Sequence, residues 1–152
     1  MPRSLDQYHR QVDELIVLIR SSFAEQSSLR LQKTSGIPTL GVRIGGDFRR
    51  DRLVMKVKEH FNFDPQTGSI DKDYRYIFLF EGQERLRIET QPGQPEHAHF
   101  PPLYIANSNR HFNISRWPPD LQDMDFVKAF EIWSAMRRLG GGQLPEPFRS
   151  TL

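Results

Sequence analysis

The chain has 152 residues, of which 37% are hydrophobic and 26% charged, and its formal net charge is only +2. This length predicts one domain with a core of its own, and the charge is too small to indicate a nucleic-acid partner by itself. No apolar run approaches the ~18 residues of a membrane-spanning helix, and the absence of cysteine excludes disulfides and thiolate metal sites, so we expect a cytoplasmic protein without a membrane partner.

The first predicted element is a helix from Ser4 to about Ala24. Ser4 and Gln7 have the spacing of a capping box, in which each side chain satisfies a free backbone N–H. Apolar residues then recur at intervals of three and four, which is typical of a helix that buries one face. These residues are Leu5, Tyr8, Val12, Leu15, Ile16, Ile19 and Phe23.

Residues 29–63 predict strands separated by turns. Short strands are expected at residues 29–33 and 37–44, and Gly45-Gly46-Asp47 predicts a turn between strands. A phosphate-cradling loop at these glycines would need a following helix, but the residues after them are basic and strand-like. Residues 52–63 alternate between apolar and polar side chains, as in a half-buried strand.

Residues 74–80 give the clearest strand, with aromatic residues at every second position. A short connection containing Gly82 follows, which predicts a hairpin. Residues 85–90 form its second arm, in which Arg85, Arg87 and Glu89 share one face. This face either meets solvent or lines a site.

Residues 91–102 hold four prolines, which predicts a stiff, irregular loop. Short strands are expected near residues 103–105 and 112–114. The final helix should begin at Asp120 or Asp123 and end before Gly140, because glycine commonly follows a helix terminus.

Together these elements predict an α+β fold. An antiparallel β-sheet of four to six strands is flanked by an N-terminal and a C-terminal α-helix, both on one face of the sheet. Residues 1–143 should form this single domain, and residues 144–152 a C-terminal tail.

The proline-rich loop carries His97 and His99, which are two residues apart. On extended backbone such residues point to the same side, so the two imidazoles can act as acid and base at neutral pH. The pair could also bind phosphate, hold a metal together with a third ligand such as His111, Glu96 or Asp120, or merely brace the loop.

Nearby arginines favour phosphate chemistry. The chain has sixteen arginines and five lysines, and the planar guanidinium matches phosphate, although a GC-rich genome also enriches arginine. An acid/base pair with arginines is what cleavage of an RNA phosphodiester through its 2′-hydroxyl requires. The candidate catalytic residues are His97, His99, Arg85 and Arg87, and the candidate substrate-binding residues are Arg75, Arg110, His111 and Tyr76. No metal and no cofactor is predicted.

Three short motifs resemble one known family. They are Tyr74-Arg75-Tyr76, Arg85-x-Arg87-x-Glu89, and Pro95-Glu96-His97-Ala98-His99 with Pro101. With the final helix, they are similar to the TumE-like toxins of prokaryotic type II toxin–antitoxin systems, over residues 74–139. The resemblance implies a small α+β ribonuclease-type toxin with an antitoxin partner.

The function predicted from the sequence is therefore a metal-independent, toxin-like protein that cleaves or binds RNA. The alternative is a non-enzymatic interaction protein, such as an antitoxin, an immunity protein or a subunit of a defence complex. The sequence leaves the oligomeric state open, a homodimer included.

Overall fold

A computed structural model describes residues 5–36, 39–63, 65–91, 94–99, 111–113, 123–146 and 148, and it describes their side chains except at 33–36, 39–40, 91, 94–99 and 111–113. The chain begins with α1 (Leu5–Leu18), which continues into the π-helical turn η1 (Ile19–Phe23), and it ends with α2 (Phe126–Arg138). Between them lie the strands β1 (Gln26–Ser27), β2 (Arg30–Gly36), β3 (Thr39–Arg50), β4 (Leu53–Phe63), β5 (Ile70–Phe80), β6 (Gln83–Gln91), β7 (Gln94–His99) and β8 (His111–Asn113).

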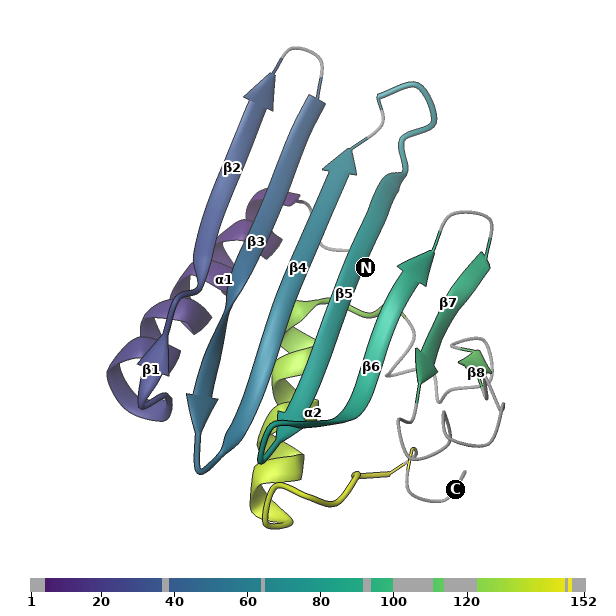
Figure 1. Cartoon of the computed structure of the whole chain (residues 1–152). Coiled ribbons are helices and arrows are strands. Elements are labelled where there is room, and N and C mark those ends of the chain that lie inside the picture. Colours follow the sequence, from purple (N-terminus) through teal and green to yellow (C-terminus); the bar gives the residue numbers. More distant parts are fainter. Residues whose placement is uncertain are drawn as a thin grey trace.

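The strands form one antiparallel sheet in the order β1-β3-β4-β5-β6-β7-β8, and β2 also pairs with β3 (Figure 1). Strands β1 and β2 thus follow one another along the same edge. Among the described strands, six have six or more residues, whereas β1 has two and β8 has three. The predicted α+β fold is confirmed.

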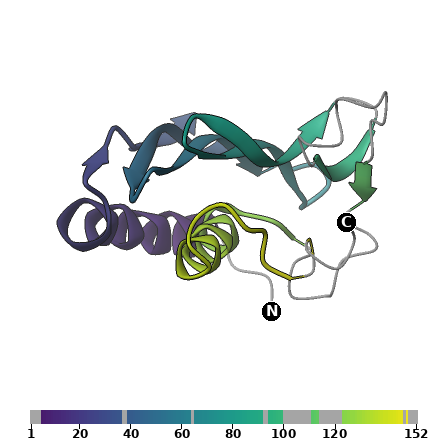
Figure 2. The same ribbon diagram turned by 60° about the horizontal axis from the view of Figure 1, so that its bottom comes forward.

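Both helices cover the same face of the sheet and leave the other face without a helix (Figure 2). Alternation along the strands produces this arrangement, because successive residues point to opposite faces. In β4, for example, Met55 and Val57 are buried under the helices, whereas Lys56 and Lys58 are exposed. We call the two sides the helix face and the open face.

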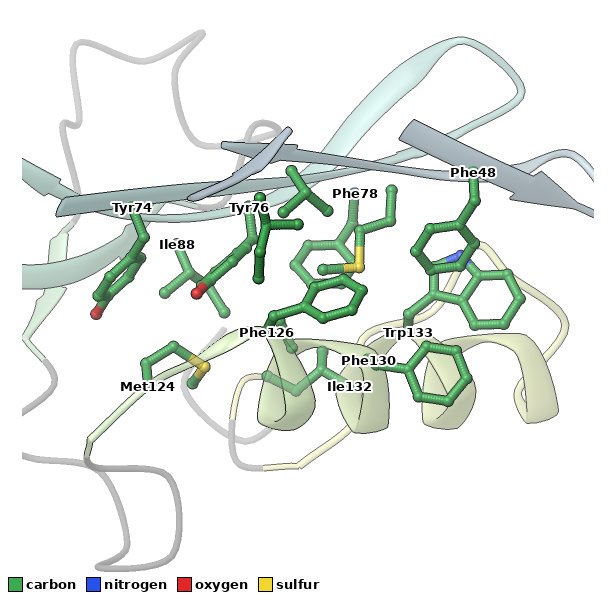
Figure 3. Packing of buried hydrophobic residues seen from close by; sticks show 14 of the residues in the cluster. Phe48, Tyr74, Tyr76, Phe78, Ile88, Met124, Phe126, Phe130, Ile132 and Trp133 are labelled. Carbon is green, nitrogen blue, oxygen red and sulfur yellow. The ribbon is translucent and has the colours of Figure 1, made fainter. Parts of the chain in front are cut away.

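Large aromatic side chains fill the space between the sheet and α2 (Figure 3). The rings of Phe48 and Trp133 meet edge to face with centroids 4.8 Å apart, an arrangement that aromatic pairs prefer. The predicted stripe of the first helix also enters this core, with Val12 and Ile19 fully buried. Leu144 and Phe148, which were expected in a tail, are buried in it as well.

Several local expectations were wrong. Gly45 and Gly46 lie inside β3, and the chain reverses at Asp51-Arg52 instead. Part of the proline-rich segment forms β7, where an irregular loop was expected. The N-cap of α2 is Asp125 rather than Asp123, because the Asp125 carboxylate accepts a hydrogen bond of 2.9 Å from the backbone N–H of Lys128.

Other expectations fall outside the described residues, namely the Ser4 cap, Asp120 and the strand at residues 103–105. Within the described residues, no helix has the length and the apolar character that crossing a membrane requires.

Candidate functional site

The register of the sheet brings the candidate histidines beside the arginine-bearing strand β6. His99 pairs with Arg87 on one side and with His111 on the other, and His97 pairs with Glu89. Directly opposed residues of an antiparallel pair lie on the same face, with Cβ atoms about 5 Å apart. These five positions therefore occupy two neighbouring rows on one face of the sheet.

That face is the open one. Leu86 and Ile88, which alternate with Arg87 and Glu89, are fully buried on the helix face. Strand β5 extends the same rows, because Arg75 pairs with Glu89 and Ile77 with Arg87. In the backbone register, His97 and His99 thus lie in the same rows as Arg75 and Arg87. The side chains of His97, His99 and His111 lie outside the described part of the chain.

Glu89 is the acid at the centre of these rows. Its side chain is only 1% exposed, and its Oε2 accepts a hydrogen bond of 2.8 Å from Nε of Arg75, which is 49% exposed. The pair joins β5 to β6 and leaves part of the Arg75 guanidinium facing solvent. The sequence placed Glu89 on the correct face but assigned it no role, because its pairing with His97 depends on the register between strands.

The two arginines of β6 differ in their surroundings. Nε of Arg87 donates a hydrogen bond of 2.6 Å to Oε1 of Glu84, which orients the side chain along the strand. Arg85 falls at a register shift between β5 and β6, and its Nε is buried with no hydrogen-bond acceptor among the described residues. Of the two, Arg87 is therefore the one in line with a histidine.

The structure does not support Tyr76 as a substrate-binding residue. Tyr76 is completely buried on the helix face, and its hydroxyl donates a hydrogen bond to Glu59. No face of the ring is available to stack on a base (Figure 3). Arg110, the remaining candidate, lies outside the described residues.

Exposed cations continue across the open face beyond the predicted site. Lys58 lies between Gly45 and Arg75, and Lys56 lies between Asp47 and Ile77. Both lysines are exposed. The open face therefore carries exposed cations beyond the histidine rows, with acids such as Asp47 and Asp73 on the same face.

A second polar cluster, unforeseen from the sequence, lies in the core. The carboxylate of Glu59 accepts hydrogen bonds from the hydroxyls of Tyr8 and Tyr76 and from the backbone N–H of Phe126. Burial raises the pKa of Glu59 to about 7, although the tyrosine hydroxyls oppose the shift. The same burial, with the neighbouring carboxylate, raises the pKa of both tyrosines well above 10.0.

This cluster joins four elements, one of which is β5 through Tyr76. Tyr8 belongs to α1, Glu59 to β4, and Phe126 begins α2. Since Glu59 is 2% exposed, a substrate cannot reach its carboxylate without opening the core. We therefore assign the cluster to structure, and the open face remains the candidate functional site.

No protein-family model, no curated protein and no solved structure matches this chain, so the resemblance to the TumE-like toxins stays a prediction.

Proposed function

We propose that the protein binds RNA on the open face of its sheet and cleaves it without a metal ion, with His97 and His99 as acid and base. The observation that carries the proposal is the register of β6, β7 and β8. It aligns Arg87 with His99 and His111, and Glu89 with His97. Exposed Arg75 and Lys58 continue these rows and supply charge for a phosphate backbone.

The register supports different roles for the two histidines. His97 pairs with Glu89 in the sheet, and a carboxylate beside a histidine favours the charged imidazolium. His99 pairs with Arg87, and a guanidinium beside a histidine favours the neutral imidazole. We therefore assign His97 as the general acid and His99 as the general base.

In the proposed reaction, His99 accepts the proton of the RNA 2′-hydroxyl, and the 2′-oxygen attacks the adjacent phosphorus. The bond from phosphorus to the 5′-oxygen breaks as His97 donates its proton to that oxygen. The products are a 2′,3′-cyclic phosphate and a free 5′-hydroxyl. Arg87 stabilises the negative charge that develops on the phosphoryl oxygens.

The first test is RNA cleavage in EDTA. We expect His97→Ala and His99→Ala each to lower the rate by about 10²–10⁴-fold, as is usual on loss of a general acid or base. His9→Ala serves as the matched control, because His9 lies on α1 in the other layer. Equal cleavage by all four proteins would rule out the assignment.

A second substrate separates the acid from the base. Uridine 3′-(p-nitrophenyl phosphate) has a leaving group that needs no proton. On this substrate His97→Ala should keep most of its activity, whereas His99→Ala should remain inactive. Equal losses in both variants would contradict the separate roles.

The second candidate function is a non-enzymatic interaction protein, and one observation favours it. Val17 and Leu18 on α1 are 59% and 45% exposed, on the layer away from the basic face. Adjacent exposed apolar side chains can mark a protein-binding surface. Growth inhibition on expression, relieved by His97→Ala, would support the toxin; inhibition that His97→Ala leaves unchanged would support the interaction protein.

A further inference from the structure

Gly45 and Gly46 are adjacent in β3, but the backbone and its neighbours require glycine at only one of the two positions. Gly46 has a φ of +118°, and a Cβ atom there would lie 2.4 Å from the carbonyl oxygen of Ser28. The fold therefore requires Gly46. A Cβ atom on Gly45 would meet no atom within 4 Å, and Gly45 is not among the residues with positive φ.

The fold has no need of glycine at position 45. Glycine inside a strand is destabilising by roughly 0.5–1 kcal/mol relative to alanine, and β-branched residues suit the strand better. In a strand, glycine often marks a place where a ligand or another backbone approaches closely. The space above Gly45 on the open face is therefore a candidate binding site.

Cations surround this space. Gly45 pairs with Arg30 on β2 and with Lys58 on β4, and Arg43 and His60 form the next cross-strand pair. These side chains border an open hollow of about 760 Å³. Hereafter we call it the Gly45 hollow.

The main cations of the hollow have no acidic partner among the described residues. Among the described residues, Arg30, Arg43 and Lys58 form no salt bridge, whereas Arg75 and Arg87 on the same face each have a glutamate partner. Of the described residues that line the hollow, Asp73 is the one acid with its side chain on the open face, and it accepts a hydrogen bond of 3.0 Å from the hydroxyl of Thr90. The Gly45 hollow is thus positively charged and suited to an anion.

We propose that the Gly45 hollow binds a phosphate group of the RNA strand, as a second subsite apart from the histidine rows. This inference rests on the proposed function. Gly45, Lys58, Arg75, Glu89 and His97 follow one another in a single cross-strand row. At ~4.8 Å per strand, Gly45 and His97 are about 19 Å apart, so one strand of RNA crossing the sheet reaches both.

Phosphate is a better match than a base. The described residues lining the hollow include no phenylalanine, tyrosine or tryptophan on which a base could stack. They include two arginines, whose planar donors match phosphate oxygens. The missing side chain at Gly45 then allows the sugar–phosphate backbone to approach the sheet between Arg30 and Lys58.

The test uses a labelled single-stranded oligoribonucleotide of about twelve nucleotides, long enough to cover both regions. Gly45→Val places a branched side chain in the hollow at its glycine, and Gly45→Glu also adds a negative charge there. We expect the dissociation constant to rise several-fold for the first and at least about tenfold for the second. Thermal melting should show that Gly45→Val is at least as stable as wild type.

Salt dependence gives an independent measure. Each phosphate contact contributes about 0.7 to the slope of log K against log salt for single strands. Arg43→Ala should therefore lower the magnitude of the slope by about that amount. Arg138→Ala, an exposed arginine at the end of α2, should leave the slope unchanged.

The outcomes separate this inference from the proposed function. If wild type binds RNA and the Gly45 and Arg43 variants bind it equally well, the Gly45 hollow is not a subsite. RNA binding by the protein would still stand. Wild type that does not bind the oligoribonucleotide would overturn both. Amide shifts of Gly45 and Lys58 on titration of wild type with the same RNA would locate the contact directly.

Discussion

Glu59 is the residue whose environment departs furthest from that of an ordinary glutamate. Its carboxylate is buried among Tyr8, Tyr76 and the start of α2, and the Asp125 carboxylate lies near enough to raise its pKa further. Three donors satisfy the oxygens, yet burial prevails because removing a charge from water is expensive. The residue therefore remains partly protonated near neutral pH.

This environment predicts a pH-dependent stability. The pKa of Glu59 is about 7 in the folded protein and 4.5 at its ordinary value. Between these two values the folded chain holds a proton that the unfolded chain has released. The free energy of unfolding should therefore fall as the pH rises through this window, by up to about 3 kcal/mol.

Urea denaturation of wild type and Glu59→Gln at about pH 5 and about pH 8 measures the effect. The glutamine variant keeps the shape of the side chain but cannot titrate, so the stability difference between the two proteins should change with pH. Other titrating groups affect both proteins alike and cancel in this difference. A difference that stays constant from pH 5 to pH 8 would contradict the raised pKa.

At the scale of elements, the start of α2 depends on one buried side chain. Asp125 caps the helix through the backbone N–H of Lys128, and loss of an N-cap costs about 1 kcal/mol. Asp125→Ala should lower the free energy of unfolding by about that amount or more, because the residue is buried. Asp125→Asn should retain most of the stability, since asparagine also caps.

Asp123→Asn is the control for this prediction. Asp123 is 92% exposed and its contact with Lys72 spans 3.7 Å, so its removal should cost little. Urea denaturation of the three variants gives the comparison. An equal loss in Asp123→Asn and Asp125→Ala would show that the cap has no special role.

The elements with a regular apolar period could be predicted from the sequence. The helix that begins near Leu5 and the strands of the 74–90 hairpin follow from local spacing alone. The position of the turn between β3 and β4 could not be predicted in this way, because Gly45-Gly46 carries the stronger local signal for a turn. The chain instead turns at Asp51 and Arg52, which adopt positive φ values of 53° and 66° that arginine rarely takes.

The candidate site depends on register, and register is not local. Alternation predicted that Arg87 and Glu89 share a face, and it did so correctly. Which histidine lies opposite which residue is set by the pairing of β6 with β7, across a segment whose prolines argued against any strand. The Gly45 hollow also depends on pairing between strands, because Arg30 lies on β2 and Lys58 on β4.

At the scale of the whole molecule, the two faces of the sheet differ in the side chains that they carry. The helix face holds the apolar core, and among the described residues the open face carries exposed cations and no helix (Figure 2). Acidic residues such as Asp13, Glu14 and Glu131 are exposed on the helices. Basic residues such as Arg10, Arg20 and Arg138 are exposed there too, so the helix layer carries charges of both signs. Binding of a polyanion depends on the local field of the open face rather than on the total charge.

Two charge-reversal pairs test this view, because they change the net charge equally. Lys56→Glu with Lys58→Glu alters the open face, and Arg10→Glu with Arg138→Glu alters the helix layer; all four residues are exposed. We expect the first pair to weaken binding of the oligoribonucleotide at least about tenfold, and the second by less than about twofold. Thermal melting of both double variants checks that the sheet stays folded, because a glutamate at position 58 would lie opposite Arg75 whereas one at position 56 would lie opposite Asp47. Equal losses in both double variants would mean that binding follows the total charge, and the open face would then not be the RNA-binding surface.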